Sequence, residues 1–124
     1  MEELFLSGAE ALYDGSFPGT GLRIGPLESP ASRSRADAVC LEAEDLGELF
    51  RDWLGELLFL LEARNQRLKE AFFETLSETE LVCLFLAEVP PVGADRTEIK
   101  AVTYHQLRVV STRDGWEASV LFDI

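Results

Sequence analysis

Two carboxylates meet at the end of the sequence, which closes on Ser-Val-Leu-Phe-Asp-Ile. Asp123 carries one of them, and the terminal carboxylate of Ile124 is directly beside it. The run before them is β-branched and aromatic, which is typical of a strand, whereas most chain ends fray into solvent. A packed end would hold the two carboxylates close together. Such a pair either lowers stability or provides a binding site.

The single histidine and a lysine fall in the apolar segment Glu98–Ser111, which alternates like a strand. His105 shares one face with Ile99, Ala101, Thr103, Leu107 and Val109. A histidine in such company is more typical of a hydrogen-bonded core residue than of a catalyst. Lys100 shares the other face with Val102, Tyr104 and Val110, where it either extends to solvent or lies against the terminal acids. In the last strand, Asp123 faces away from the set Trp116, Ala118, Val120 and Phe122.

Other chemical constellations have a simpler structural explanation. The histidine has no nucleophile at a recognisable elbow, and Gly19-Thr20-Gly21 is not followed by a helix that would bind phosphate. Four acids surround the start of a predicted helix, where the macrodipole favours negative charge: Glu42, Glu44, Asp45 and Glu48. Cys40 and Cys83 each lie in an apolar run and are expected to be buried free thiols. The sequence gives little support for an enzyme, and no catalytic residue is predicted.

Composition limits the partners. The chain has 124 residues, 47% of them hydrophobic, which suits one globular domain over residues 1–124. Its net charge of −12 would repel phosphates, so direct nucleic-acid binding is not expected, and cations or a basic protein surface are better matched. The first residues are acidic, and no apolar run reaches the length of a membrane span. We expect a protein of the reducing cytoplasm.

Helical periodicity appears twice. Leu4, Phe5, Ala9, Leu12 and Tyr13 predict a helix over residues 2–14 that ends at Gly15. Residues 16–35 are rich in Gly, Pro and Ser and predict a long loop with one short strand. Residues 36–44 predict a strand. Asp45 and Glu48 then begin a long core helix that ends near Arg64 and Asn65.

Alternation with a period of two governs the rest. Arg67–Ser77 and Glu80–Val89 predict an antiparallel hairpin, and Pro90, Pro91 and Gly93 break the chain after it. A second hairpin follows, with its turn at Asp114-Gly115. The pattern predicts an α+β fold in which two helices pack on a mostly antiparallel sheet.

Three segments together resemble the archease family. They are DLGELFRDWLGELLFLLE in the long helix, EIKAVTYHQLRV in the penultimate strand and WEASVLFDI at the end. The resemblance runs through nearly the whole chain. It implies an accessory protein of a tRNA-splicing RNA ligase, one that promotes guanylylation of the ligase and its turnover in tRNA splicing or RNA repair, acting like a chaperone rather than an enzyme.

The resemblance also implies a divalent-ion site, for calcium or magnesium. In the family this site uses the penultimate aspartate and the chain-end carboxylate, which match Asp123 and Ile124, together with an aspartate of a first-strand His-Thr-Ala-Asp motif. Lys100 matches the family's motif lysine, and with His105 it is a candidate for contacting the partner or supporting the ion site. A bound cation would neutralise the two terminal carboxylates.

One departure from the family affects this site. The chain begins at the family's first helix and carries no segment for the preceding strand, so the motif aspartate is missing. Ca²⁺ takes about six to eight oxygens and a carboxylate offers two, so we expect incomplete, weak binding. A sheet lacking one strand would expose an edge and favour homo-oligomers. Either the start codon was placed too far downstream, or the chain is a shortened form.

Two alternatives to the ligase-assisting role stand beside it. One is an acidic protein-interaction module without metal chemistry, and the other is a small hydrolase. Recovery of an RNA ligase with the protein from a cell extract would separate the first role from the module. Multiple-turnover hydrolysis by the protein alone would favour the hydrolase.

Overall fold

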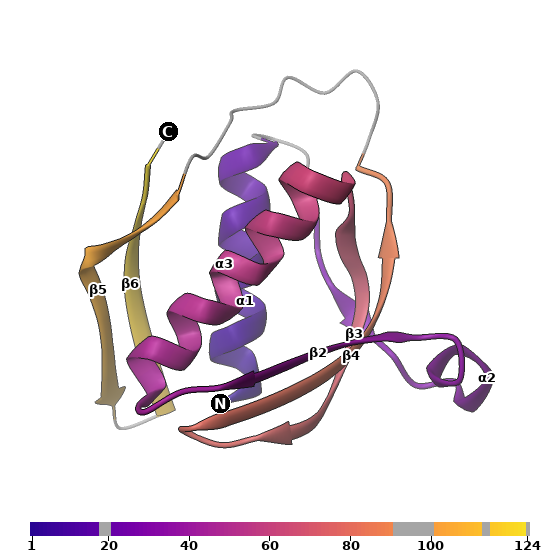
Figure 1. Ribbon diagram of the computed structural model, residues 1–124, viewed down its shortest axis with the longest axis horizontal. Coiled ribbons are helices and arrows are strands. Elements are labelled where there is room, and N and C mark those ends of the chain that lie inside the picture. The colour runs from indigo at the N-terminus through magenta and orange to yellow at the C-terminus, as the bar shows by residue number, and fades with distance from the viewer. Residues whose placement is uncertain (18–20, 91–100, 113–114, 124) are drawn as a thin grey trace.

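The structure, a computed structural model, describes residues 1–17, 21–90, 101–112 and 115–123. Helices α1 (Glu2–Ser16) and α3 (Leu46–Arg64) lie between two sheets (Figure 1). One sheet has four strands in the order β1-β3-β4-β2, and the other pairs β5 with β6. α3 contacts β2 and β3 of the first sheet and β5 of the second, while α1 contacts α3 and β6. The predicted α+β class is confirmed.

Local signals explain the bounds of both long helices. The Asp45 side chain accepts a hydrogen bond from the Glu48 N–H at 2.8 Å, so the predicted start of α3 is confirmed. Asn65 ends α3 in the left-handed conformation, with φ of 51°. α1 runs past Gly15, its predicted end, because the chain turns away only at Phe17, whose φ is −131°.

The segment before β2 is more structured than expected. The short strand predicted there is β1 (Gly25–Pro26), which pairs in parallel with β3 at Glu70 and Ala71. A further helix, α2 (Pro30–Arg33), was missed. Its signal is local, since Ser29 caps the first turn and Pro30 stands at the first helical position, where its missing N–H costs nothing.

Three antiparallel strands form the rest of the first sheet. β3 (Arg67–Leu76) and β4 (Glu80–Glu88) make the predicted hairpin, and β2 (Asp37–Glu42) pairs with the other edge of β4. β3 is irregular between Leu68 and Glu70 and again between Phe73 and Thr75. Because the parallel strand β1 adds to this antiparallel set, the sheet is mixed.

The C-terminal hairpin stands apart from these strands. β5 (Ala101–Thr112) pairs with β6 (Gly115–Asp123), which confirms the predicted hairpin. Gly115, predicted to lie in the turn, is instead the first residue of β6 and pairs with Thr112. Asp114 itself lies outside the described residues. The sequence predicted one sheet, whereas β5 and β6 form a second one across the helices (Figure 1).

Aromatic rings fill the space between α1, α3 and the first sheet. The Phe5 ring lies edge-on to those of Phe50, Trp53 and Phe73, with centroids 5.5 to 6.2 Å apart. All four side chains are buried. The Trp53 indole N–H donates to the Phe5 carbonyl at 2.9 Å, so the largest core side chain also satisfies its polar atom.

Candidate functional site

Strand β6 extends to Asp123, the last residue that the structure describes. Asp123 pairs with Ala101 and Phe122 with Val102, so β6 is held in a ladder to its last described residue. The expectation that the final run is strand rather than a frayed end is confirmed as far as Asp123. Ile124, the second candidate metal ligand, lies outside the described residues, and so does Lys100. Ala101, which follows Lys100 in the sequence, is the residue that pairs with Asp123.

His105 lies in an interruption of the same ladder. The pairing moves from Thr103–Leu121 to Arg108–Ser119, so five steps along β5 match two along β6. The predicted face of Ile99 to Val109 stays a prediction, because Ile99 and the side chains of β5 lie outside what the structure describes. The site prediction itself, Asp123 and Ile124 with Lys100 and His105, stays a prediction.

The acids near the start of α3 serve the helix. Asp45 caps the first turn through the Glu48 N–H, as the sequence suggested. Across residues 1–17 and 21–90, no group of three His, Cys, Asp or Glu side chains is placed to hold a metal ion. Asp45 and Glu48 thus have the helix role that the sequence suggested, whereas Glu42 is the last residue of β2.

The two cysteines differ in environment. Cys83 is fully buried as predicted, and burial raises the pKa of its thiol to about 12. Cys40 is exposed, so the prediction that it is buried is wrong. The reason is alternation in β2, where Val39 takes the buried position and Cys40 faces outward.

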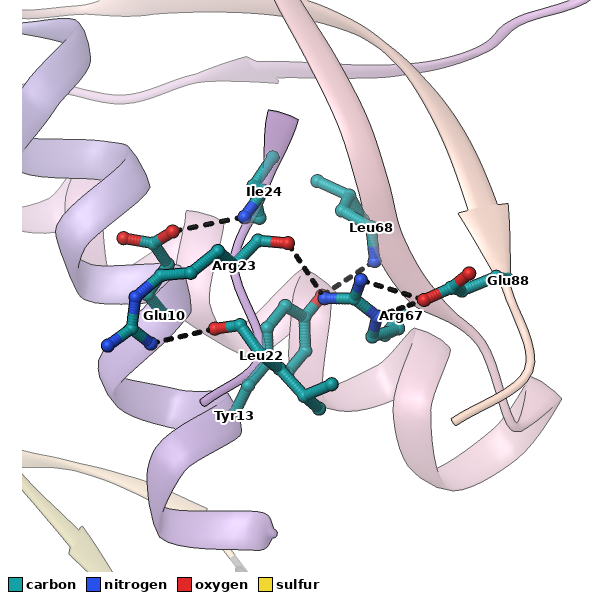
Figure 2. A network of polar contacts seen from close by, with 8 residues as sticks. All are labelled: Glu10, Tyr13, Leu22, Arg23, Ile24, Arg67, Leu68 and Glu88. Carbon is teal, nitrogen blue, oxygen red and sulfur yellow. Dashed lines mark hydrogen bonds and ion pairs between the residues drawn. The ribbon is translucent and has the colours of Figure 1, made fainter. Parts of the chain in front are cut away.

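A polar network that sequence reasoning missed joins α1 to the first sheet (Figure 2). Arg67 is buried, with 6% of the residue exposed. Its guanidinium Nε–H donates to one Glu88 carboxylate oxygen at 2.7 Å. It also donates to the Arg23 carbonyl at 3.1 Å. The Tyr13 hydroxyl accepts from the Leu68 N–H at 2.9 Å, next to Arg67. Burial is the main cause that raises the Tyr13 pKa to about 12.

The same network holds the segment before β1. Glu10 of α1 accepts a hydrogen bond from the Ile24 N–H at 3.0 Å, and Arg23 donates to Asp14 at 3.3 Å and to the Leu22 carbonyl at 2.9 Å. These contacts fasten residues 22–24 to α1 and to β3. The signal available in the sequence was weak, because an arginine at the first position of a predicted strand is usually exposed. We therefore assign the network a structural role, which is to hold residues 22–24 against α1 and β3.

Among the described residues, no helix combines the length and the apolar character needed to cross a bilayer.

Comparison with known proteins places the chain among related sequences. A model of the Archease protein family (MTH1598/TM1083) matches residues 1–124. The chain is 39% identical over 99 residues to the protein archease of Methanosarcina acetivorans, covering 75% of this chain and 68% of that one. It is 30% identical over 128 residues to the protein archease of Methanopyrus kandleri, covering 99% of this chain and 85% of that one.

A solved structure has the same fold. It is that of an archease described as a possible chaperone from Thermotoga maritima. The superposition gives a TM-score of 0.60 at 19% identity and covers 99% of this chain and 82% of the other. At this identity, the likeness supports the fold and not a particular activity.

Proposed function

Because the chain belongs to the archease family, we propose that it is an accessory protein of a tRNA-splicing RNA ligase. In this role it promotes guanylylation of the ligase and so supports its turnover. The match of the family model over residues 1–124 carries the proposal. Further support comes from the net charge of −12, since an acidic protein would act on the ligase protein rather than on RNA.

We propose a divalent-ion site at the end of β6 as part of this role. Asp123 and the terminal carboxylate of Ile124 would hold the ion, and oxygen donors of this kind suit calcium or magnesium. Two carboxylates offer fewer oxygens than Ca²⁺ takes, so water or further residues must complete the shell. In this proposal Lys100 would supply the neighbouring positive charge, because Ala101, the next residue in the sequence, pairs with Asp123.

Transfer of GMP to the ligase tests the role directly. The RNA ligase of the same genome is incubated with labelled GTP and divalent ion, with and without this protein, and the covalent ligase–GMP adduct is measured over time. We expect faster adduct formation and repeated ligation cycles when the protein is present. An unrelated protein of similar size and negative charge is the control for crowding and ion binding. Equal rates with and without the protein would exclude the role.

The alternative role of an acidic interaction module makes a different prediction. A module without metal chemistry would bind its partner equally well with and without divalent ion. Measuring binding to the ligase with and without a chelator separates the two, since the proposed ion site requires that chelation change the binding.

A further inference from the structure

The two faces of the four-stranded sheet differ in what covers them. Residues of one face pack against the helices and are buried, as shown by Val39, Leu81, Cys83, Phe85 and Phe73. Alternation along each strand turns the residues between them to the opposite side. An antiparallel sheet with one solvated face normally carries polar residues there.

In this sheet, the opposite side is apolar at its centre. Leu84 of β4 pairs with Ala38 of β2 on one side and with Phe72 of β3 on the other, and Val82 pairs with Cys40. We define the outer-face patch as the side chains of Ala38, Cys40, Phe72, Val82, Leu84 and Leu86. Ala38 and Cys40 are exposed and the other four are partly exposed. Helix α2 also contacts this sheet, at β4, and the Cζ atom of its Arg33 lies 4.0 Å from the Phe72 ring centroid.

Acidic side chains lie toward both ends of the outer-face patch, while the Arg33 guanidinium lies over Phe72 within it. Glu42 and Glu80 are paired directly across β2 and β4, and both are exposed. Glu70 is opposite Leu86, and Glu74 is exposed further along β3. An open depression of about 330 Å³ lies beside the Glu42–Glu80 pair, lined by Cys40, Leu41, Glu42, Glu80, Leu81 and Val82. Like charges directly opposite each other destabilise a sheet.

We propose that the outer-face patch is where the partner RNA ligase docks, through a surface that is apolar at its centre and carries Lys and Arg around it. The identity of this occupant rests on the function proposed above. An apolar centre within a charged rim is the usual anatomy of a protein interface. A basic partner would relieve the repulsion between Glu42 and Glu80, which no ion pair among the described residues offsets.

A second copy of this chain fits the patch less well. Face-to-face contact would bring two acidic rims together on chains that each carry −12. Pairing two copies of β2 along their whole length in antiparallel fashion would set Asp37 opposite Glu42. Charge therefore favours a basic partner over self-association at this face.

Native cysteines allow a test on the unaltered protein. Cys40 lies in the outer-face patch and is exposed, whereas Cys83 is buried and its thiol has a raised pKa. A maleimide should therefore label Cys40 first, as only the thiolate reacts readily. Saturating ligase should slow labelling of Cys40 by about tenfold or more, as expected for a fully covered interface position. Unchanged labelling at saturation would exclude the patch as the docking surface.

Substitutions test the apolar centre and the rim separately. Leu84→Lys places a charge in the apolar centre, where the partner's apolar surface would bury it unpaired. The double change Glu42→Lys with Glu80→Lys reverses the charge of the rim at two exposed positions. Each should weaken ligase binding by about tenfold or more. Phe59→Ser is the control, because Phe59 is 51% exposed on α3, away from this sheet face. If Leu84→Lys fails to fold by circular dichroism, the rim variant still decides.

The outcomes separate the docking surface from the proposed function. If the wild type stimulates the ligase and the Leu84 and rim variants bind it equally well, the proposed function stands and the proposed docking surface is wrong. The same holds if only Phe59→Ser weakens ligase binding. No binding or stimulation by the wild-type protein would overturn both. Sedimentation of the free protein tests whether a second copy occupies the patch. A dimer that Leu84→Lys dissociates would assign the patch to self-association.

Discussion

The Tyr13 hydroxyl, on α1, accepts a hydrogen bond from the Leu68 N–H at the start of β3, and both residues are fully buried. Fifty-five positions separate them in the sequence. The bond satisfies a backbone donor at the point where β3 is irregular, between Leu68 and Glu70. Backbone donors buried without a partner are rare because they cost as much as a lost hydrogen bond. Tyr13 thus joins the first helix to the sheet.

Removing this hydroxyl should lower stability. Tyr13→Phe keeps the ring but leaves the Leu68 N–H unpaired and buried, which costs about 1–3 kcal/mol. Urea unfolding measures the change. A loss below about 0.5 kcal/mol would mean that another group or water satisfies the Leu68 donor.

Alkaline pH should act through the same residue. Burial raises the Tyr13 pKa from 10.0 to about 12, so the folded chain holds the proton more tightly than the unfolded chain. The resulting stability is fully present below about pH 10 and is lost as the pH rises toward 12. Cys83 acts similarly, with its pKa raised from 9.0 to about 12. Unfolding free energy measured from pH 8 to 12 should fall less steeply in Tyr13→Phe and in Cys83→Ala than in the wild type.

Local patterns were sufficient for most of the elements. The apolar spacing of α3 and its Asp45 cap are local properties, so its bounds were predicted closely. The β3–β4 and β5–β6 hairpins each connect neighbouring strands, and their pairing was predicted too. The division into two sheets was missed, because it depends on which side of the helices each hairpin packs. Cys40 was misplaced because alternation gives two faces without saying which is buried.

Two glycines on the helices predict opposite effects. A Cβ at Gly8 would lie 2.6 Å from the Phe50 ring, which is buried between α1 and α3. Gly8→Ala should therefore destabilise the protein by about 1–3 kcal/mol, the usual cost of overpacking. A Cβ at Gly55 meets nothing within 4 Å, so Gly55→Ala should gain up to about 1 kcal/mol from helix propensity. Thermal unfolding of both variants checks the pair, and equal shifts would contradict it.

The buried Arg67 depends on its carboxylate partner. The Glu88 side chain is 36% exposed while that of Arg67 is 7% exposed, so solvent replaces only part of the lost contact. Glu88→Gln should cost about 1–3 kcal/mol, because a charged group loses its partner. Asp14→Asn is the matched control in the exposed Arg23–Asp14 pair and should change stability by at most about 1 kcal/mol. Denaturant unfolding that ranks the two variants the other way would contradict this.

The candidate site was less accessible to prediction than the fold. The β-branched run before Asp123 predicted the strand that carries it, and the pairing of Asp123 with Ala101 agrees with that prediction. The function of the pair Asp123 and Ile124 came from resemblance, since composition cannot distinguish a metal ligand from a solvated acid. The Tyr13–Arg67 network was missed because it joins residues far apart in the sequence.

Divalent-ion binding should depend on Asp123. Asp123→Ala leaves the proposed site with one carboxylate, so calorimetric titration with Ca²⁺ or Mg²⁺ should show binding in the wild type and none in the variant. Asp37→Ala removes an exposed aspartate on β2 and should bind as the wild type does. Equal affinity of the wild type and Asp123→Ala would exclude the terminal site.

Lys100 should matter for ligase stimulation and not for folding. If it contacts the ligase or balances the terminal acids, Lys100→Ala will slow formation of the ligase–GMP adduct while the unfolding free energy stays within about 0.5 kcal/mol of the wild type. The chain offers a matched control in Lys69→Ala, which removes an exposed lysine on β3. Both variants carry the same change in net charge, so a general effect of charge would slow the two reactions equally. A selective loss at Lys100 would support its role beside Asp123, whereas full stimulation by Lys100→Ala would mean that this lysine is only solvated.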